Sequence, residues 1–254
     1  MAATLSLIRP DWSAPTRVKA VVTTRPGGVS LPPYDGLNLG THVADDPAAV
    51  AANRALLLWG LQGIAPCEAP QWLNQVHGTT VVEAAAHLAE REQWVPDADA
   101  VTTTLPGIPC VVMTADCLPV FFTDKAGQRV AVAHAGWRGL VDGVLEATLA
   151  RFDNPADVLC WLGPAIGPES FEVGAEVREA FVSRLPATES AFVTGEKPGK
   201  YLADIYALAR LRLHEAGVTA ISGGDFDTVE DRERFFSYRR DGRTGRMASI
   251  IWLA

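Results

Sequence analysis

Two histidines and one cysteine in this sequence stand in short segments that together could bind a metal ion. His77 lies in NQVHG, Cys117 in TADCLPV and His134 in AHAGWRG. One soft thiolate and two imidazole nitrogens form a donor set that suits zinc. Three protein ligands leave the fourth position of a tetrahedral ion open to water or substrate, which distinguishes a catalytic zinc from a structural one.

The local sequence indicates how each candidate ligand would be presented. Gly78 lets another group come close to His77, and Cys117 is expected on a turn, where Pro119 should end the regular backbone. His134 lies where an expected strand passes into a helix, a favoured position for sites in α/β structures. Each residue also has an ordinary interpretation, as a hydrogen-bonded histidine or an inert buried thiol. The three residues are separated by 40 and 17 positions, so only the tertiary fold can bring them together.

The composition is that of an ordinary globular protein. Of the 254 residues, 48% are hydrophobic and 20% are charged, which indicates neither disorder nor a fibrous class. The 30 acidic and 22 basic residues give a net charge of −8, which argues against a general affinity for nucleic acid or anionic membranes. An anionic substrate would therefore need local arginines.

Signals for targeting and for disulfides are weak. The N-terminal segment lacks a basic opening and a signal-peptide core, and no apolar stretch approaches membrane-spanning length, so we expect a cytoplasmic protein. The four cysteines form no CxxC pair, which argues against a zinc finger or a disulfide framework. Cys110 and Cys160 lie in apolar runs and are expected to be buried, whereas His87 and His214 are expected to face solvent.

Short β-branched runs alternate with helical patterns along the whole chain. Strands are expected at residues 18–24, 79–82, 110–113, 120–123, 129–133, 158–162 and 249–253. Helices are expected at residues 47–58, 140–151, 175–185 and 204–216, the first opening after Asp45-Asp46 as its cap. Asp241-Gly242 predicts a hairpin turn, and the apolar residues 247–254 predict a buried or paired strand. No repeat or long linker divides the chain, so one domain over residues 1–254 is expected.

Longer motifs resemble one bacterial family over nearly the whole chain. They are TTRPGGVS at residues 23–30, YDGLNLGTHV at 34–43, the three ligand segments, GPAIGP at 163–168, FFSYRRDG at 235–242 and TGRM at 244–247. The family is described variously as laccase-like multicopper polyphenol oxidases, as purine nucleoside phosphorylases typified by YfiH and YlmD, and as peptidoglycan editing factors. The resemblance implies a single α+β domain with mixed β-sheets sandwiched between helices. It also implies a zinc ion bound by His77, Cys117 and His134.

The same resemblance implies purine nucleoside chemistry, namely phosphorolysis of adenosine, inosine, guanosine and methylthioadenosine, and deamination of adenosine. In some relatives the related activity is editing, in which a misincorporated L-serine is cleaved from the UDP-muramyl precursor of peptidoglycan. The expected partners are therefore small molecules, without nucleic acid or membrane, and the oligomeric state stays open. Many relatives carry a Cys-Thr pair before FFSYRR. This chain has Phe226-Asp227-Thr228 instead, which weakens any mechanism that uses a second thiol.

Deamination and amide cleavage need an activated water and a proton carrier, for which a carboxylate near the metal is the expected type. Asp116, beside Cys117, and Glu172, after GPAIGP, are the acid-base candidates, with a positioning or structural role as the alternative. Arg138, which lies close to His134 in the sequence, is favoured over the other arginines as the residue that would hold phosphate near the metal.

Phosphorolysis also needs an anion site. Arg25, Arg239 and Arg240 could hold phosphate through forked hydrogen bonds, although a surface salt bridge is the ordinary role of a single arginine. Asn38 and His42 lie on the early loop and could contact a nucleoside, although an asparagine in a glycine-bounded turn often only forms the turn.

Three further hypotheses stay open. A copper oxidase of phenols would need many imidazoles, and the chain has five histidines. A metal-free cysteine hydrolase would use Cys117 as nucleophile and His134 or His77 as its base. A non-enzymatic binding module would leave the ligand-rich loops without a role.

Overall fold

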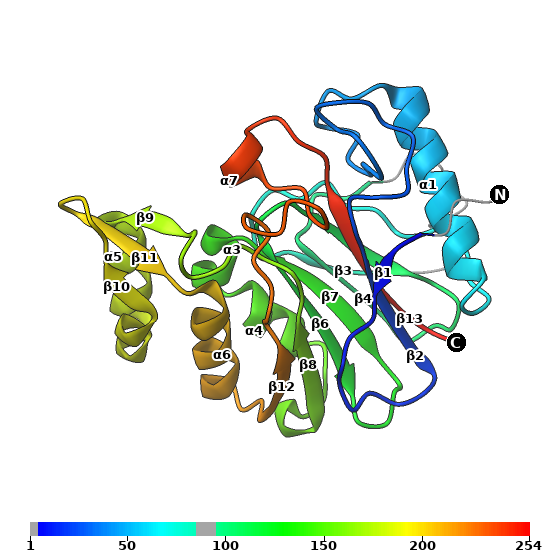
Figure 1. Cartoon of the computed structure of the whole chain (residues 1–254). Coiled ribbons are helices and arrows are strands. Elements are labelled where there is room, and N and C mark those ends of the chain that lie inside the picture. Colours follow the sequence, from blue (N-terminus) through cyan, green and yellow to red (C-terminus); the bar gives the residue numbers. More distant parts are fainter. Residues whose placement is uncertain (1–4, 85–94) are drawn as a thin grey trace.

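The computed structural model describes residues 5–84 and 95–254, so the expectation for His87 lies outside the described residues. Within these two ranges the strands form three sheets, two of them large and covered by helices on their outer faces (Figure 1). A small lobe projects from one side of the body (Figure 1). This arrangement confirms the expected α+β fold with mixed sheets between helices.

The first large sheet is antiparallel and includes the C-terminal segment. Its order is β1 (Leu7–Ile8), β2 (Val18–Thr23), β13 (Met247–Leu253) and β5 (Cys110–Thr114). The C-terminal strand is buried along its length and pairs on both sides. The expectation of a buried, paired strand at this end of the chain is therefore confirmed.

The second large sheet has six strands of mixed direction. Its order is β12 (Ala220–Gly223), β8 (Val158–Leu162), β6 (Leu118–Asp124), β7 (Val130–Ala135), β4 (Ala100–Thr103) and β3 (Val81–Glu83). The outer pairs β12–β8 and β3–β4 are parallel, and the central pairs are antiparallel. A third, antiparallel sheet forms the lobe together with α5 (Ala175–Arg184) and consists of β10 (Phe192–Thr194), β11 (Lys200–Ala203) and β9 (Glu172–Gly174).

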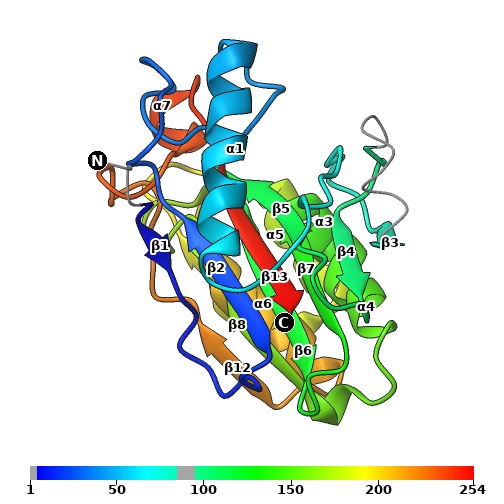
Figure 2. The ribbon, with the colours of Figure 1, turned by 90° about the vertical axis from the view of Figure 1, so that its right-hand side faces the viewer.

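Helices cover the outer faces of the large sheets. α1 (Pro47–Gln62) lies along the first sheet (Figure 2), and Asp46 caps it by accepting from the backbone N of Ala48 at 2.9 Å. The second sheet is covered by α3 (Trp137–Asp142), α4 (Val144–Leu149) and α6 (Ile205–Glu215). The remaining turns of helix are α7 (Tyr238–Asp241) and the 3-10 segments Pro155–Asp157 and Pro186–Ala191.

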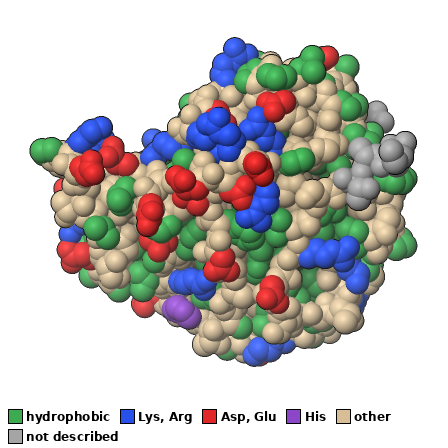
Figure 3. Space-filling model, viewed as in Figure 1, with side chains coloured by type: hydrophobic (Ala, Val, Ile, Leu, Met, Phe, Trp, Pro, Cys, Tyr) green, Lys and Arg blue, Asp and Glu red, His purple; other side chains and the backbone are tan. Residues whose placement is uncertain are grey.

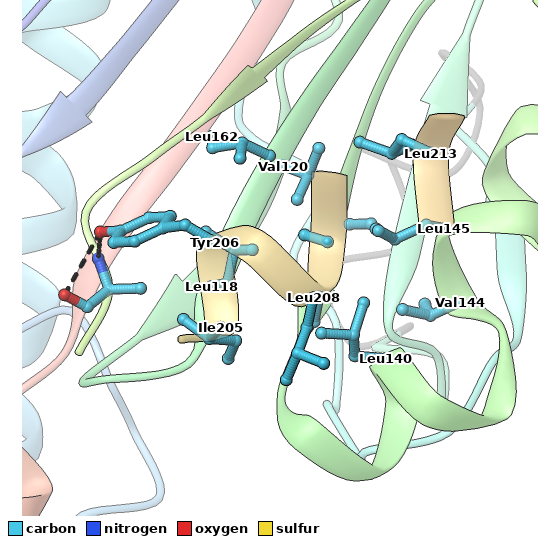
Figure 4. Packing of buried hydrophobic residues seen from close by; sticks show 14 of the residues in the cluster. Leu118, Val120, Leu140, Val144, Leu145, Leu162, Ile205, Tyr206, Leu208 and Leu213 are labelled. Carbon is cyan, nitrogen blue, oxygen red and sulfur yellow. Dashed lines mark hydrogen bonds between the residues drawn. The ribbon is translucent and has the colours of Figure 1, made fainter. Parts of the chain in front are cut away.

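Successive side chains of a strand point to opposite faces of its sheet, so each large sheet contributes to two apolar layers. In β5, Cys110 faces the second sheet, whereas Val111 faces α1. In β6, Phe121 faces the first sheet, whereas Val120 faces the helices. Figure 4 shows part of the helix-covered layer, which includes Leu118, Leu140, Val144, Leu145, Leu208 and Leu213.

Strands β1, β4, β9, β10, β11 and β12 were not expected from the sequence, and three expectations are wrong. Gly143, with φ of 105°, breaks the helix expected over residues 140–151 into α3 and α4. The hairpin turn expected at Asp241-Gly242 is wrong, because Asp241 is the last residue of α7 and Gly242, with φ of 68°, ends it. Pro119 lies inside β6, where its carbonyl accepts from the backbone N of Gly163 at 2.9 Å, so it does not end the regular backbone.

Other expectations are confirmed. Cys110 and Cys160 are buried, and His214 is exposed. Among the described residues, no helix has both the length and the apolar character needed to cross a membrane. On the face drawn in Figure 3, acidic and basic side chains are interspersed over the body and the lobe.

Phe121 joins the two large sheets and offers a test of the layered core. Its side chain is 1% exposed, and its ring stacks on Trp161 with centroids 5.6 Å apart. Phe121→Ala should lower the free energy of unfolding by about 3–5 kcal/mol, because it removes these contacts and leaves a cavity. Urea unfolding followed by circular dichroism measures the loss. Val193→Ala, on an exposed position of β10, should change it by less than about 0.5 kcal/mol, and an equal effect of both changes would contradict the prediction.

Candidate metal centre

The three predicted donors, far apart in the sequence, converge at one point. Nε2 of His77 lies 3.8 Å from Sγ of Cys117, and the rings of His77 and His134 meet edge to face with centroids 4.8 Å apart. The ligand atoms of all three lie within 4.8 Å of one another, and within residues 5–84 and 95–254 they are the one such group of three or more. His134 is buried, Cys117 is half-buried and His77 is exposed. The cluster therefore opens to solvent on the side of His77.

Strand pairing and a glycine create the space for the donors. The register of β6 and β7 pairs Leu118 with Ala135, which brings Cys117 to the end of β7 where His134 lies. A Cβ on Gly136 would lie 2.7 Å from Cδ2 of His77 and 3.1 Å from Sγ of Cys117. Glycine at this position therefore keeps free the point at which the donors meet.

A buried carboxylate that the sequence analysis did not single out holds two of the donors. Oδ1 of Asp99 lies 2.8 Å from Nδ1 of His134 and accepts from the backbone N of His77 at 3.0 Å. Its Oδ2 accepts from the backbone N of Gly78 at 2.6 Å. Because Nδ1 of His134 faces Asp99, Nε2 is the nitrogen left to face Cys117.

The loop that carries His77 has an unusual backbone conformation. His77 has φ of 60°, in the left-handed region that costs about 1–2 kcal/mol for a residue with a Cβ. The successive N–H groups of Val76, His77 and Gly78 all donate to the Asp99 carboxylate. These charge-assisted bonds stabilise the loop in the conformation that presents His77 to the other donors.

In the metal-free protein, Cys117 and His134 favour their charged forms. Burial raises the pKa of the Cys117 thiol, but the charge of His134 and hydrogen bonds from His134 and His77 outweigh it and lower the pKa to about 6. Burial lowers the pKa of His134, but the Cys117 thiolate and the hydrogen bond to Asp99 outweigh it and raise the pKa to about 9. The thiol is thus held in the deprotonated form that a metal ion requires.

The donor set fits a zinc ion. Tetrahedral zinc binds a thiolate sulfur at about 2.3 Å and an imidazole nitrogen at about 2.0–2.1 Å, which places these two ligand atoms about 3.5 Å apart. The separation of 3.8 Å between Nε2 of His77 and Sγ of Cys117 is close to this value. The carboxylate of Asp99 on the far nitrogen of His134 is the outer partner that metal-binding histidines usually have.

Alkylation of the metal-free protein tests the lowered pKa of Cys117. Because the thiolate is the reactive form, the rate of alkylation by iodoacetamide should rise through a midpoint near pH 6, and zinc should protect the thiol. Burial raises the pKa of Cys110 and of Cys160, so both should stay unmodified at neutral pH and serve as internal controls in peptide mass spectrometry. A midpoint at the ordinary thiol value of about 8.5 would contradict the prediction.

The open side of the centre forms a wall of a pocket of about 390 Å³. This volume lies in the range of small-molecule sites. His42, Tyr238 and Arg246 line the pocket together with the three donors. Its other lining residues are Leu73, Asn74, Gln75, Met113, Thr114 and Ala115.

Comparison with known proteins relates the chain to one family. Residues 19–254 match the family model described as multi-copper polyphenol oxidoreductase laccase. The chain belongs to this family. A purine nucleoside phosphorylase of Pseudomonas aeruginosa is 56% identical over 247 residues, covering 97% of this chain and 98% of the relative. The purine nucleoside phosphorylase YfiH of Escherichia coli is 54% identical over 248 residues, again covering 97% and 98%.

Solved structures similar to this laccase-family chain share its fold. A protein of Neisseria meningitidis has a TM-score of 0.89 and 49% sequence identity, covering 97% of this chain and 98% of its own. YlmD of Geobacillus stearothermophilus has a TM-score of 0.84 and 32% identity, covering 99% of each chain. The resemblance to YfiH and YlmD is therefore confirmed.

Asp116, the acid-base candidate next to Cys117, has a carboxylate fixed by two hydrogen bonds. It has φ of 89°, and its carboxylate accepts from Oγ1 of Thr228 and from the backbone N of Arg239, both at 2.6 Å. One oxygen thus ties the Cys117 loop to the turn at Thr228, and the other ties it to α7. This arrangement favours the positioning role over the acid-base role for Asp116.

Two of the predicted anion-binding arginines have carboxylate partners. Nη2 of Arg25 lies 2.6 Å from the Asp35 carboxylate, and Nη2 of Arg240 lies 2.7 Å from that of Asp241. Arg239 instead donates to the backbone carbonyl of Glu172 at 3.1 Å. None of these residues is part of the pocket lining.

Arg138 and Asn38 also lie outside the pocket lining, whereas His42 belongs to it. Arg138 is exposed, with its guanidinium 4.5 Å from the ring centroid of Trp137. Asn38 is fully buried, and its Oδ1 accepts from the backbone N of Gly40 at 3.0 Å, which is the turn-forming role named as its alternative. The structure thus brings His42 and the three donors together in the pocket lining. The other predicted residues are not part of that lining, and Glu172 lies in β9 of the lobe.

Three residues that the sequence analysis missed belong to this centre, namely Asp99, Tyr238 and Arg246. Asp99 had a usable signal, because a carboxylate at the start of the apolar strand Ala100–Thr103 must find partners once it is buried. Tyr238 and Arg246 lie inside FFSYRRDG and TGRM, but nothing in those motifs indicates which side chains face the pocket.

Proposed function

We propose that the protein is a zinc enzyme of purine nucleosides, which catalyses phosphorolysis of adenosine, inosine, guanosine and methylthioadenosine and also deaminates adenosine. The observation that carries the proposal is a three-donor centre open to a pocket of small-molecule size. Three protein donors with an accessible side are typical of catalytic rather than structural zinc. The names of relatives at 56% and 54% identity, both purine nucleoside phosphorylases, support the substrate class.

His77, Cys117 and His134 would hold the metal. Zinc is favoured over copper because multicopper oxidation needs many imidazoles, and the cluster has two. When bound, zinc supplies Lewis acidity that polarises an oxygen of water, phosphate or substrate.

The pocket side chains can orient a nucleoside and move a proton. Tyr238, at 61% exposure, offers an aromatic face for a purine base. Burial, followed by the positive charges of Arg246 and Arg54, lowers the pKa of His42. Its imidazole is therefore neutral near pH 7 and can accept a proton from water or a substrate hydroxyl. We assign His42 as the proton carrier.

We also propose that the protein acts in the cytoplasm, because its four cysteines are free.

The test of this proposal is a substrate panel with the zinc-loaded protein. Inosine with phosphate should yield hypoxanthine and ribose 1-phosphate, and adenosine should yield inosine. Omission of phosphate separates phosphorolysis from hydrolysis. If neither product forms and L-serine is released from the UDP-muramyl precursor, the nucleoside proposal fails in favour of the editing amidase. Stoichiometric copper together with oxygen uptake on a phenol would favour the oxidase instead.

A further inference from the structure

Two partly buried arginines beside the pocket have no acidic partner. Neither Arg54 nor Arg246 has an Asp or Glu oxygen within 4.0 Å among the residues that the structure describes, unlike Arg25 and Arg240. The chain carries 30 acidic residues against 22 basic ones, so carboxylates are plentiful elsewhere. Two partly buried guanidinium groups without a carboxylate within 4.0 Å therefore lie near one another.

Arg54 and Arg246 are held on opposite sides of one residue. Nε of Arg54 donates to the carbonyl of Leu39 at 3.0 Å, and the backbone N of Leu39 donates to the carbonyl of Arg246 at 3.3 Å. The Arg54 guanidinium lies 3.7 Å from the ring centroid of Trp72, and its Nη2 lies 4.0 Å from Sδ of Met113, which lines the pocket. Arg246, which lines the pocket, and Arg54, which lies behind Met113 of its wall, are therefore held near one another through Leu39.

The guanidinium of Arg246 is also anchored in a defined position. Its Nη1 donates to the carbonyls of Thr244 and Gly245 at 3.1 and 3.0 Å, and its backbone N donates to Oδ1 of Asn38 at 2.9 Å. Because only Nη1 is bonded to backbone carbonyls, the N–H groups of the other guanidinium nitrogens can donate to an oxyanion in the pocket.

Electrostatics at this end of the pocket favour an added negative charge. Burial lowers the pKa of Arg54 to about 10 and also lowers the pKa of Arg246, where the negative charges of Cys117 and Asp116 offset the effect of burial only in part. Both charges act on His42, where they add to burial in lowering the pKa of the imidazole. A desolvated cation without a partner is unfavourable, and a bound anion would compensate both arginines at once.

We propose that Arg54, Arg246 and His42 form a binding site for a phosphate oxyanion beside the His77, Cys117 and His134 centre. Arginine forks match the geometry of phosphate oxygens, and a neutral histidine can donate a further hydrogen bond. The identification with the phosphate co-substrate of phosphorolysis rests on the proposed function. The phosphates of a UDP-bearing substrate offer the same chemistry from a second source.

Calorimetric titration of the zinc-loaded protein with inorganic phosphate, in the absence of nucleoside, measures this site. Phosphate affinity should fall at least about tenfold in Arg246→Met and in Arg54→Met, because each loses charge-assisted donors. Methionine keeps an unbranched apolar stem, which in Arg246 lies against Gly40. Arg210→Met is the matched control. Arg210 is also partly buried and donates to backbone carbonyls, but at β12, so its loss should leave phosphate affinity unchanged.

Arginine modification of the wild-type protein gives a second measurement that does not depend on the folding of a variant. Phosphate should protect Arg54 and Arg246 from phenylglyoxal, as read by peptide mass spectrometry, while the exposed Arg239 stays reactive. Equal modification with and without phosphate, or equal phosphate affinity in wild type and both variants, would overturn the site.

A parallel titration with UDP distinguishes the two sources of the oxyanion. Binding of UDP but not of phosphate, lost in both variants, assigns the site to a nucleotide-bearing substrate, and binding of neither overturns it. Because these measurements contain no nucleoside, they are independent of the proposed function. A protein that binds phosphate here but releases no purine keeps the site and rejects the nucleoside proposal.

Discussion

In Cys117→Ala, we expect stoichiometric zinc to be lost and nucleoside turnover to fall by about 10³-fold or more. The thiolate is one of three donors within 4.8 Å of one another, and the variant leaves two imidazoles to hold the ion. Loss of the metal would remove several kcal/mol of charge stabilisation in the transition state. Metal analysis after dialysis and an assay of purine release measure the two effects on the same sample.

Cys67→Ala provides the matched control, because Cys67 is also a free, half-buried cysteine but lies outside the centre. It should retain both zinc and activity. A Cys117→Ala protein that keeps stoichiometric zinc would contradict the site. If that protein also lost activity, the metal-free hydrolase with Cys117 as nucleophile would become the better explanation.

Replacing Asp99 by asparagine should weaken zinc binding by about 10–100-fold, the usual effect of removing an outer partner of a ligand histidine. Asp99 receives the backbone N–H groups of His77 and Gly78 and faces Nδ1 of His134. An amide of the same size cannot accept all of these bonds, so the His77 loop and the His134 ring should lose their fixed orientation. Competition with a chromophoric chelator measures the affinity. The absorption spectrum of the cobalt-substituted protein reports the altered coordination.

Asp97→Asn is the control for this change, because Asp97 lies two residues away, is exposed and accepts from Nδ2 of Asn74 at 2.6 Å. It should leave zinc affinity and the cobalt spectrum unchanged. Unfolding of the metal-free proteins in urea separates a loss of stability from a loss of metal binding. Unchanged affinity in Asp99→Asn would show that the carboxylate stabilises the fold without positioning the ligands.

The regular parts of the fold could be predicted because local patterns determine them. The segments around Val158–Leu162 and Ala175–Arg184 occur where the strand and helix patterns placed them, and Asp46 caps α1. Two of the wrong expectations fall at glycines, Gly143 and Gly242, and the third falls at Pro119. The pattern over residues 140–151 is helical throughout, but the left-handed conformation of Gly143 depends on how α3 and α4 pack on the sheet.

The sequence by itself singled out the three candidate donors, because His77, Cys117 and His134 stand in specific motifs. It could not determine their convergence, which follows from the pairing of β6 with β7 and from the Asp99 carboxylate. A donor type is a local property, whereas an intact site depends on contacts between residues distant in the sequence.

Contacts between distant residues also explain why the arginines that the sequence predicted to bind an anion differ from those that we propose from the structure. A sequence shows how many arginines a chain has, but only the tertiary structure decides which of them are neutralised. Arg25 and Arg240 have carboxylate partners, whereas Arg246, which lines the pocket, and Arg54, which lies against Met113 of its wall, have none within 4.0 Å in the described residues. A ligand can be bound by those charged side chains that have no oppositely charged partner within the protein.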